Sequence, residues 1–293
     1  MTKGKIGTVL EEQKNLESDH LTDNTWRQKS YRDKEFIASE AARPIRVLCE
    51  LAAPGERFKE EQINSTIVMF GSARSKPMED SEKELLHIEG QLLNDPNSKE
   101  LQHQLHIAKM GIKLSKYYEE GVELARLLAE WSENIIQPEK RFYICSGGGP
   151  GMMEAANKGA ELAGAKNIGL NINLPFEQTP NPYQTEQISF EFHYFFVRKF
   201  WFAYLAKALV VFPGGYGTMD ELFEILTLIQ TQKIKKTMPI VLYGNEFWEG
   251  FMNPEHLLKW GVISPEDLEM FKICDTPAEA FEYLKGALTE EYL

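Results

Sequence analysis

Five short apolar runs, each followed by a stretch of helical character, constrain the fold of this chain more than any other feature. The runs lie at residues 66–70, 142–145, 167–172, 208–212 and 239–243. Nearly continuous apolar strands are typical of a parallel sheet covered by helices on both faces, and alternation of strand with helix is typical of doubly wound folds. The sequence therefore predicts an α/β protein with a doubly wound, mainly parallel, Rossmann-like sheet.

The segments outside this alternation are predicted to be helical. Residues 1–63 form the expected helical N-terminal extension, whose first part, 1–24, is polar and has little to bury. Residues 64–293 form the expected Rossmann-like domain. The long stretch between the first two strands is predicted to hold two helices, at 80–94 and 99–132, so this domain is expected to carry a helical insertion at about 78–116.

Composition bears on the partners of the protein. The chain carries 32 basic and 44 acidic residues, a net charge of −12, and such a surface repels a polyphosphate backbone unless basic residues gather locally. The densest basic segment, residues 233–236, is short. The sequence also contains no run of about 18 apolar residues that would span a bilayer. We therefore expect neither a nucleic acid nor a membrane as a partner.

The cysteines and histidines indicate the compartment and the absence of a metal. Cys49, Cys145 and Cys274 lie far apart and form no CxxC pair, so we expect reduced thiols and no zinc site. The first residues include no apolar segment typical of a secretory signal. His103 and His106 are three residues apart, but no third ligand is spaced to join them. We expect a cytoplasmic protein without a metal.

Two glycine-rich clusters, residues 146–154 and 212–221, follow predicted strands and lead into helices. Glycine lets the backbone take positive φ and turn N–H groups toward a ligand, and the start of the next helix adds free donors and the positive end of a dipole. Ligands of open α/β sheets bind at the carboxyl ends of the strands. The clusters therefore predict a phosphate site, although each would also serve as a tight strand-to-helix turn.

The candidate binding residues come from three loops at this edge of the sheet. After the first strand the candidate is Ser72, with Arg74 beside it. In the first cluster, Glu154 is either a second acidic group of the site or a carboxylate that only benefits from the helix dipole. The clusters supply the following candidates: Gly148, Gly149, Gly151, Met152 and Glu154 from the first, and Gly214, Gly215, Tyr216, Gly217 and Thr218 from the second.

Two common nucleotide motifs are absent. When the dinucleotide pattern G-x-G-x-x-G is counted from Gly147, its third glycine falls on Met152, and residues 169–173 contain no acidic residue to hold a ribose. The P-loop pattern G-x-x-x-x-G-K-[ST] does not occur either. The ligand class that remains is a mononucleotide held by two short loops.

The second cluster resembles the signature of the LOG family, the cytokinin riboside 5′-monophosphate phosphoribohydrolases, many of which were labelled possible lysine decarboxylases. Residues 213–221 match the family pattern P-G-G-x-G-T-x-x-E at every position, and Arg198 with Lys199 matches its R-K pair. Residues 147–153 are similar to its G-G-G-x-x-G-x-M element, with the glycines shifted by one. The resemblance covers about residues 65–245 and is closest to the longer bacterial members.

The resemblance implies a hydrolase that cleaves the N-glycosidic bond of a nucleoside 5′-monophosphate, either a cytokinin riboside monophosphate or AMP, to free base and ribose 5-phosphate. It also implies that no cofactor is needed and that the protein is a homodimer or a larger homo-oligomer. Decarboxylation is disfavoured because it usually needs a lysine that holds pyridoxal phosphate, and no lysine here has a recognisable setting for that group. The alternative function is a non-catalytic nucleotide-binding sensor or carrier.

Glu221 and Arg198 are the candidate catalytic residues. Positive charge develops on the ribose in the family's oxocarbenium-like transition state, and a carboxylate such as Glu221 stabilises it. The alternative is a capping box in which Thr218 and Glu221 only cap their own helix. The resemblance assigns Arg198 to hold the nucleotide or its leaving group, with Lys199 as a further binding residue. Their helix, at about 194–207, is apolar nearly all round, which predicts that it is buried.

Overall fold

The structure is a computed structural model that describes residues 29–174 and 179–293. The chain divides into two compact units, residues 1–48 and 49–293. The described part of the first unit contains a 3-10 helix, η1 (Ser30–Arg32), the helix α2 (Lys34–Ala38) and the beginning of α3 (Arg43–Glu60). The division falls inside the expected extension 1–63, because Phe58 near the end of α3 is buried in the second unit against the rings of Phe190 and Trp201.

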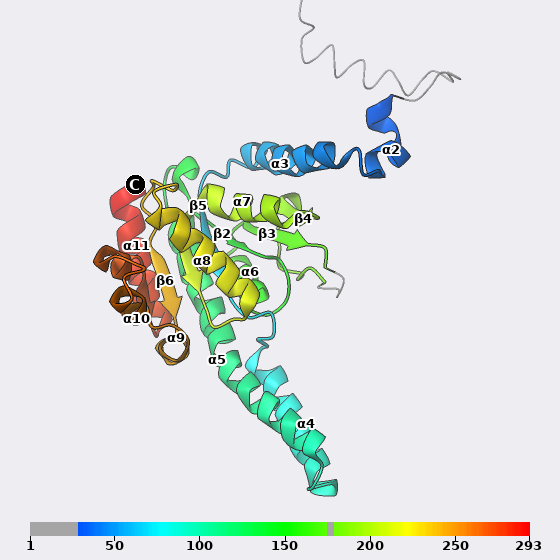
Figure 1. Ribbon diagram of the computed structural model, residues 1–293, viewed down its shortest axis with the longest axis vertical. Coiled ribbons are helices and arrows are strands. Elements are labelled where there is room, and N and C mark those ends of the chain that lie inside the picture. Colours follow the sequence, from blue (N-terminus) through cyan, green and yellow to red (C-terminus); the bar gives the residue numbers. More distant parts are fainter. Residues whose placement is uncertain (1–28, 175–178) are drawn as a thin grey trace, which may run out of the picture. The chain divides into compact units, whose positions relative to one another are not determined.

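Within the described residues, the second unit contains one sheet of seven parallel strands in the order β4-β3-β2-β1-β5-β6-β7 (Figure 1). The chain adds β2, β3 and β4 on one side of β1 and then crosses to the other side for β5, so the winding reverses between β1 and β5. The expected doubly wound, Rossmann-like α/β fold is confirmed. The strands are β1 (Thr66–Phe70), β2 (Tyr143–Ser146), β3 (Asn167–Ile172), β4 (Ser189–Phe192), β5 (Ala206–Val211), β6 (Ile240–Tyr243) and β7 (Lys272–Cys274).

Helices cover both faces of the sheet (Figure 1). On one face, α5 (Lys99–Glu133), α6 (Met152–Leu162) and α11 (Pro277–Tyr292) join alternate strand residues in the main apolar core. On the other face lie α7 (Phe195–Leu205) and α8 (Tyr216–Gln230), and there Phe202 packs edge-on against Phe70 of β1 at a centroid distance of 4.8 Å. Burial on both faces is the reason why the central strands are apolar throughout.

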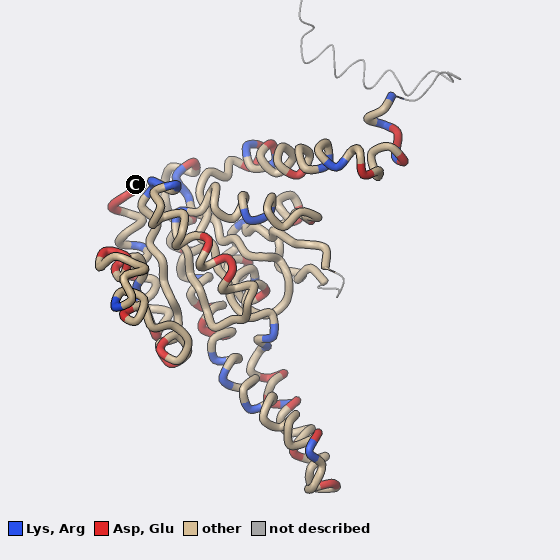
Figure 2. The backbone as a smooth tube through the Cα atoms, viewed as in Figure 1, with Lys and Arg blue, Asp and Glu red and all other residues tan. Residues whose placement is uncertain are grey.

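The helical insertion between β1 and β2 is a hairpin of two helices. The helix α4 (Met78–Asn94) lies along the N-terminal part of α5 (Figure 1), where a buried hydrogen bond of 2.6 Å joins the hydroxyl groups of Ser81 and Ser115. Ser98 caps α5 by accepting from the N–H of Leu101. Acidic and basic residues are interspersed along both helices (Figure 2), as expected for surfaces that face water.

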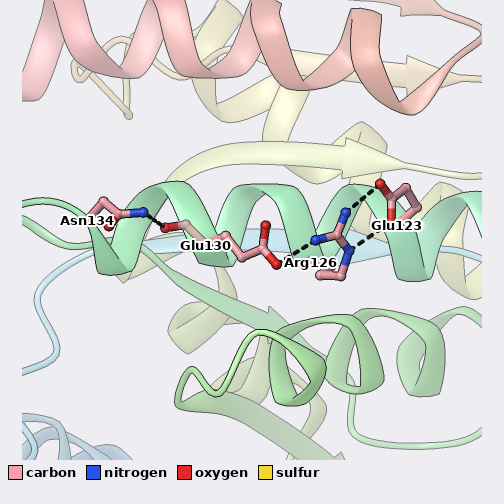
Figure 3. A network of polar contacts seen from close by, with 4 residues as sticks. All are labelled: Glu123, Arg126, Glu130 and Asn134. Carbon is pink, nitrogen blue, oxygen red and sulfur yellow. Dashed lines mark hydrogen bonds and ion pairs between the residues drawn. The ribbon is translucent and has the colours of Figure 1, made fainter.

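The C-terminal part of α5 has a polar side and an apolar side. On the polar side, Arg126 donates to the carboxylates of Glu123 and Glu130, and the Asn134 side chain donates to the carbonyl of Glu130 (Figure 3). Ion pairs of this kind on a helix surface contribute about 0.3–0.5 kcal/mol each. The opposite side of α5 belongs to the main core, so apolar burial holds this helix against the sheet.

The expectation that α7 is buried, because it is apolar nearly all round, is wrong for one side of this helix. Val197, Trp201 and Phe202 are buried, but four aromatic side chains on the same helix are exposed by 43–61%. Aromatic residues on every side of a helix do not distinguish a core position from a surface that another molecule covers. The exposed residues of this aromatic face are Phe195, Phe196, Phe200 and Tyr204.

The remaining described elements are short helices. They are η2 (Pro138–Lys140), η3 (Glu186–Ile188), α9 (Asn245–Phe251), α10 (Pro254–Lys259) and η4 (Pro265–Glu269). The three cysteines are free thiols. Among the described helices, none combines the length and the apolar character that a membrane span requires. The cytoplasmic location stays a prediction.

Candidate functional site

A cavity of about 680 Å³ lies where the winding of the sheet reverses. Its walls come from the loops that follow β1, β2, β3 and β5, from the first turns of α7 and α8, and from Leu114 of α5 and Phe247 of α9. In open α/β sheets, ligands bind at this place because the loops on the two sides of the reversal diverge and leave a crevice. The cavity is therefore the candidate functional site.

The turn after β5 forms one wall of the cavity. Gly214, Gly215, Tyr216, Gly217 and Thr218 all line it, as the sequence predicts for a binding loop. Helix α8 begins here without a side-chain cap, so the N–H groups of its first turn have no partner within the helix and carry the positive end of its dipole. This wall is suited to an anion.

The loop after β1 joins the two glycine turns. The N–H of Ser72 donates to the carbonyl of Pro213 at 3.0 Å, and the carbonyl of Ser72 accepts from the N–H of Met152 at 3.0 Å. Ser72 and Arg74 both line the cavity. The structure thus brings all three predicted loops together at one edge of the sheet.

The turn after β2 contributes less to the cavity than the sequence predicts. Gly147 and Met153 line it, whereas the predicted binding residues of this turn lie behind the wall. Met152 is 1% exposed and packs in the main core. The carboxylate of Glu154 accepts a hydrogen bond of 2.6 Å from the hydroxyl of Tyr118. The other predicted residues that are not part of the described lining are Gly148, Gly149 and Gly151.

Glu221 lies in the cavity wall and is 7% exposed. Burial raises the pKa of Glu221 to about 7, although Arg198 and Lys199 oppose that rise. The capping-box alternative is wrong, because Gly215 is the N-cap of α8 and both Thr218 and Glu221 lie inside the helix. Glu221 is therefore a buried carboxyl group that titrates near neutral pH, as a group that exchanges protons with a substrate requires.

Arg198 lies in the same cavity and is held by backbone carbonyls. Its Nε donates to the carbonyl of Leu170 at 2.6 Å, and its Nη2 donates to the carbonyl of Gly147 at 3.4 Å. The guanidinium also lies 5.0 Å from the ring centroid of Phe202. Burial lowers the pKa of Arg198, and the nearby Glu221 opposes this effect. The two predicted catalytic residues are thus electrostatic neighbours.

Lys199, the other predicted binding residue of α7, lies close enough to Glu221 to lower the pKa of that carboxyl group, but its direct partners are two other carboxylates. Its Nζ forms ion pairs with Asp220 at 3.0 Å and with Glu224 at 2.8 Å. Among the described residues, Lys199 does not line the cavity, whereas Asp220 does. In this structure Lys199 joins α7 to α8.

Sequence reasoning missed most of the apolar wall. Ile172 is the last residue of β3 and Leu174 follows it, and the rule that ligands bind at the carboxyl ends of strands could have identified them. Leu114 and Phe247 come from helices far away in the sequence and belong to no motif. Among the described residues, no group of three or more histidine, cysteine, aspartate or glutamate side chains is placed to hold a metal ion.

A parallel sheet with a cavity at its reversal point and an uncapped helix start in the cavity wall defines a Rossmann-like protein whose candidate site is suited to an anion. Residues 153–284 match the model of the family described as "Possible lysine decarboxylase". This match confirms the resemblance to the LOG family, and the matched segment includes Arg198, Glu221 and the whole turn after β5.

Two curated proteins illustrate the relationship. The pyrimidine/purine nucleotide 5′-monophosphate nucleosidase of Escherichia coli K12 is 32% identical over 117 residues, which are 36% of this chain and 25% of that protein. The cytokinin riboside 5′-monophosphate phosphoribohydrolase LOG of rice is 28% identical over 141 residues, which are 47% of this chain and 53% of that protein. The chain thus matches about a quarter of the bacterial relative and about half of the plant one.

A solved structure that resembles this chain is the molybdenum cofactor carrier protein of Chlamydomonas reinhardtii. It is 17% identical, with a TM-score of 0.41, and the alignment covers 77% of this chain and 99% of the carrier protein.

Proposed function

We propose that the protein is a nucleoside 5′-monophosphate phosphoribohydrolase, which hydrolyses the N-glycosidic bond to give free base and ribose 5-phosphate. The observation that carries this proposal is the placement of Glu221 and Arg198 in one cavity with the uncapped start of α8. The activities for which the bacterial and plant relatives are named support the same reaction.

In this mechanism the 5′-phosphate binds to the free N–H groups at the start of α8, with Thr218 beside them. The phosphate then fixes the ribose against Glu221, four to five residues farther along the same helix. Remote binding energy of this kind orients the reacting carbon and lowers the entropic part of the barrier.

Glu221 acts on the ribose and on water. As the bond from C1′ to the base nitrogen breaks, its electron pair moves to the base and positive charge grows on the ribose, where the carboxylate stabilises it. Glu221 then takes a proton from the water whose oxygen bonds to C1′. The carboxyl group passes this proton to the base nitrogen, which leaves Glu221 as a carboxylate again. The guanidinium of Arg198 favours the ionised form of Glu221 and so opposes the effect of burial, which raises the pKa of this carboxyl group to about 7.

The substrates that we propose are AMP and cytokinin riboside monophosphates. The wall made by Met153, Ile172, Leu174 and Phe195 is apolar, and such a wall suits the flat face of a base.

We also propose that the protein is a homodimer joined through the aromatic face of α7. Phe196 and Tyr204 are exposed by 61% and 60%. Two charged residues lie between them in the sequence: Lys199 is paired with Asp220 and Glu224, and Arg198 lies in the cavity. Such a face pairs with a second copy without burying an unpaired charge. Light scattering on Phe196→Glu should give a monomer and on the wild type a dimer, whereas Leu93→Glu on α4 should remain dimeric. A monomeric wild type would exclude this interface.

The function is tested with purified protein and a panel of nucleoside 5′-monophosphates, by measuring free base. Glu221→Gln should lose about 10²–10⁴-fold in kcat, while Glu224→Gln, on the same helix but outside the cavity, should stay within about threefold. Binding of AMP by the wild type without release of adenine would instead support the sensor or carrier function. A fully active Glu221→Gln protein would overturn the role of this carboxylate.

A further inference from the structure

A cluster of buried amide side chains lies behind the turn after β2, and the proposed mechanism makes no use of it. Asn157, Asn167, Asn171 and Asn181 are each at most 8% exposed. Buried amides are costly unless their donors and acceptors are paired, and here they bond to one another and to the backbone. A network of this size beneath a single turn fixes the position of that turn.

Asn181 and Gln184 hold two carbonyl groups of the turn. The Gly148 carbonyl accepts from the Asn181 N–H at 2.8 Å, from Asn181 Nδ2 at 3.0 Å and from Gln184 Nε2 at 2.6 Å. The Gly149 carbonyl accepts from Asn181 Nδ2 at 3.0 Å. Asn181 Nδ2 also donates to Asn157 Oδ1 at 2.9 Å, so the same amide group joins the turn to the network.

The carbonyl that precedes these two belongs to Gly147, and it bonds to Arg198 instead. The Nη2 of Arg198 donates to it at 3.4 Å. A side chain at Gly147 would place its Cβ 2.5 Å from that nitrogen, so the guanidinium lies directly against the turn. The other anchor of Arg198 is the carbonyl of Leu170 in β3. Any shift of the turn therefore moves one of the two anchors that fix the guanidinium.

We infer that Asn181 is a positioning residue: by holding the turn after β2, it sets the guanidinium of Arg198 beside Glu221. The expected effect of Asn181 on catalysis rests on the proposed function. The claim that Asn181 fixes the position of Arg198 does not depend on that function. Asn181 touches neither the cavity nor Glu221 among the described contacts, so its effect on the reaction passes through Arg198.

The kinetic test compares Asn181→Ala with Asn167→Ala. Asn167 belongs to the same network but bonds to Asn157 and Tyr183 rather than to the turn, so its replacement controls for a loss of stability. Asn181→Ala should lower kcat about tenfold or more, because small misplacements of catalytic groups are costly, and should change KM less than threefold. Asn167→Ala should leave kcat within about threefold.

The pH profile separates positioning from a general loss of stability. The charged groups around Glu221 are Arg198, Lys199, Asp220 and Glu224. If Arg198 moves away, Glu221 loses the largest effect that lowers its pKa, and the acidic limb of kcat/KM moves to higher pH. This limb should move in Asn181→Ala and stay in Asn167→Ala. An unmoved limb with unchanged kcat, in a wild type that is active, would overturn the inference and leave the proposed function intact.

A measurement without substrate covers the case in which the wild type shows no nucleosidase activity. The Nε–H of Arg198, bonded to Leu170, should give an NMR signal that exchanges slowly with water and is missing in Arg198→Lys. Asn181→Ala and Asn181→Asp should shift this signal or speed its exchange, and Asn167→Ala should not. An Arg198 signal that is identical in all folded variants would exclude the positioning role.

Discussion

The turn after β2 and the turn after β5 are both rich in glycine and both lead into a helix, but their glycines have different surroundings. Gly148 and Gly151 have φ of +73° and +72°, and a Cβ there would lie 2.2 Å from Asn171 Oδ1 and 2.4 Å from the Ser72 carbonyl. At Gly215 and Gly217, a Cβ would meet no atom within 4 Å. Gly214 of the second turn is packed like the glycines of the first turn, because a Cβ there would lie 2.2 Å from Thr218 Oγ1. Packing thus requires Gly148, Gly151 and Gly214, whereas Gly215 and Gly217 face open space.

The largest effect that this comparison predicts is on stability at the first turn. Gly151→Ala combines a left-handed backbone with a clash against the Ser72 carbonyl, so it should lower the free energy of unfolding by about 3 kcal/mol or more. The control is Gly164→Ala, which has φ +68° but meets nothing within 4 Å and should lose only about 1–2 kcal/mol. Denaturant unfolding measures both. Equal losses would show that the close packing at Gly151 has no energetic role.

Glu221, the buried carboxyl group that follows the second turn, should make the stability of the protein depend on pH. The pKa of Glu221 is raised to about 7 in the folded protein, so the folded state favours its neutral form. This stabilisation is complete below about pH 4.5 and is lost as the pH rises through 7. Glu221→Gln should therefore be more stable than the wild type at pH 8, by on the order of 1–3 kcal/mol, and about equally stable at pH 4.5.

Ionisation of Glu221 should lower the stability of the protein but raise its activity. The mechanism needs Glu221 as a carboxylate, so kcat/KM of the wild type should rise with pH up to about 7. Glu154→Gln, which keeps an oxygen to accept from Tyr118, should retain both the pH profile and most of the activity. A flat profile, or a Glu154→Gln protein as inactive as Glu221→Gln, would break the distinction between the two turns.

At Gly217 of the second turn, substitution of glycine should weaken binding and not the fold. Gly217 lies inside α8 with free space around it, and alanine is favoured over glycine in helices by up to about 1 kcal/mol. Gly217→Ala should therefore unfold at the same or a higher temperature, while KM for the nucleotide rises about tenfold because the methyl group hinders close approach of the phosphate to the backbone. Gly286→Ala in α11, also in open space, should keep the wild-type KM. A destabilised Gly217→Ala protein would contradict the comparison.

The central part of the fold could be predicted because burial on both faces leaves a continuous apolar run in the sequence. The edge strands β4 and β7 were not predicted. In β4, buried and exposed residues alternate, and β7 is only three residues long, so neither produces such a run. The rule that identifies central strands therefore fails at the edges of the same sheet.

The sequence predicted the site correctly only where the residues of a motif line the cavity. Glu221, Arg198 and the turn after β5 lie in the cavity as expected, because Gly215 and Gly217 carry no side chain that would fill the space at the start of α8. The turn after β2 carries a similar pattern for a different reason, the packing of Gly148 on Asn171. The sequence alone does not distinguish a glycine that leaves room for a ligand from a glycine that allows close packing, because the residue is the same in both cases.

The smallest predicted effect concerns Ser72, which lies between the two turns. Its backbone bonds to both, to the carbonyl of Pro213 and to the N–H of Met152, while its hydroxyl oxygen accepts only from the N–H of Arg74 among the described contacts, at 3.1 Å. Ser72→Ala keeps the backbone bonds, so it should cost less than about 1 kcal/mol of stability and raise KM no more than about threefold. Calorimetry and steady-state kinetics measure these effects. A loss of activity near that of Glu221→Gln would mean that the hydroxyl itself contacts the substrate, and that the loop after β1, rather than the turn after β5, forms the main binding wall.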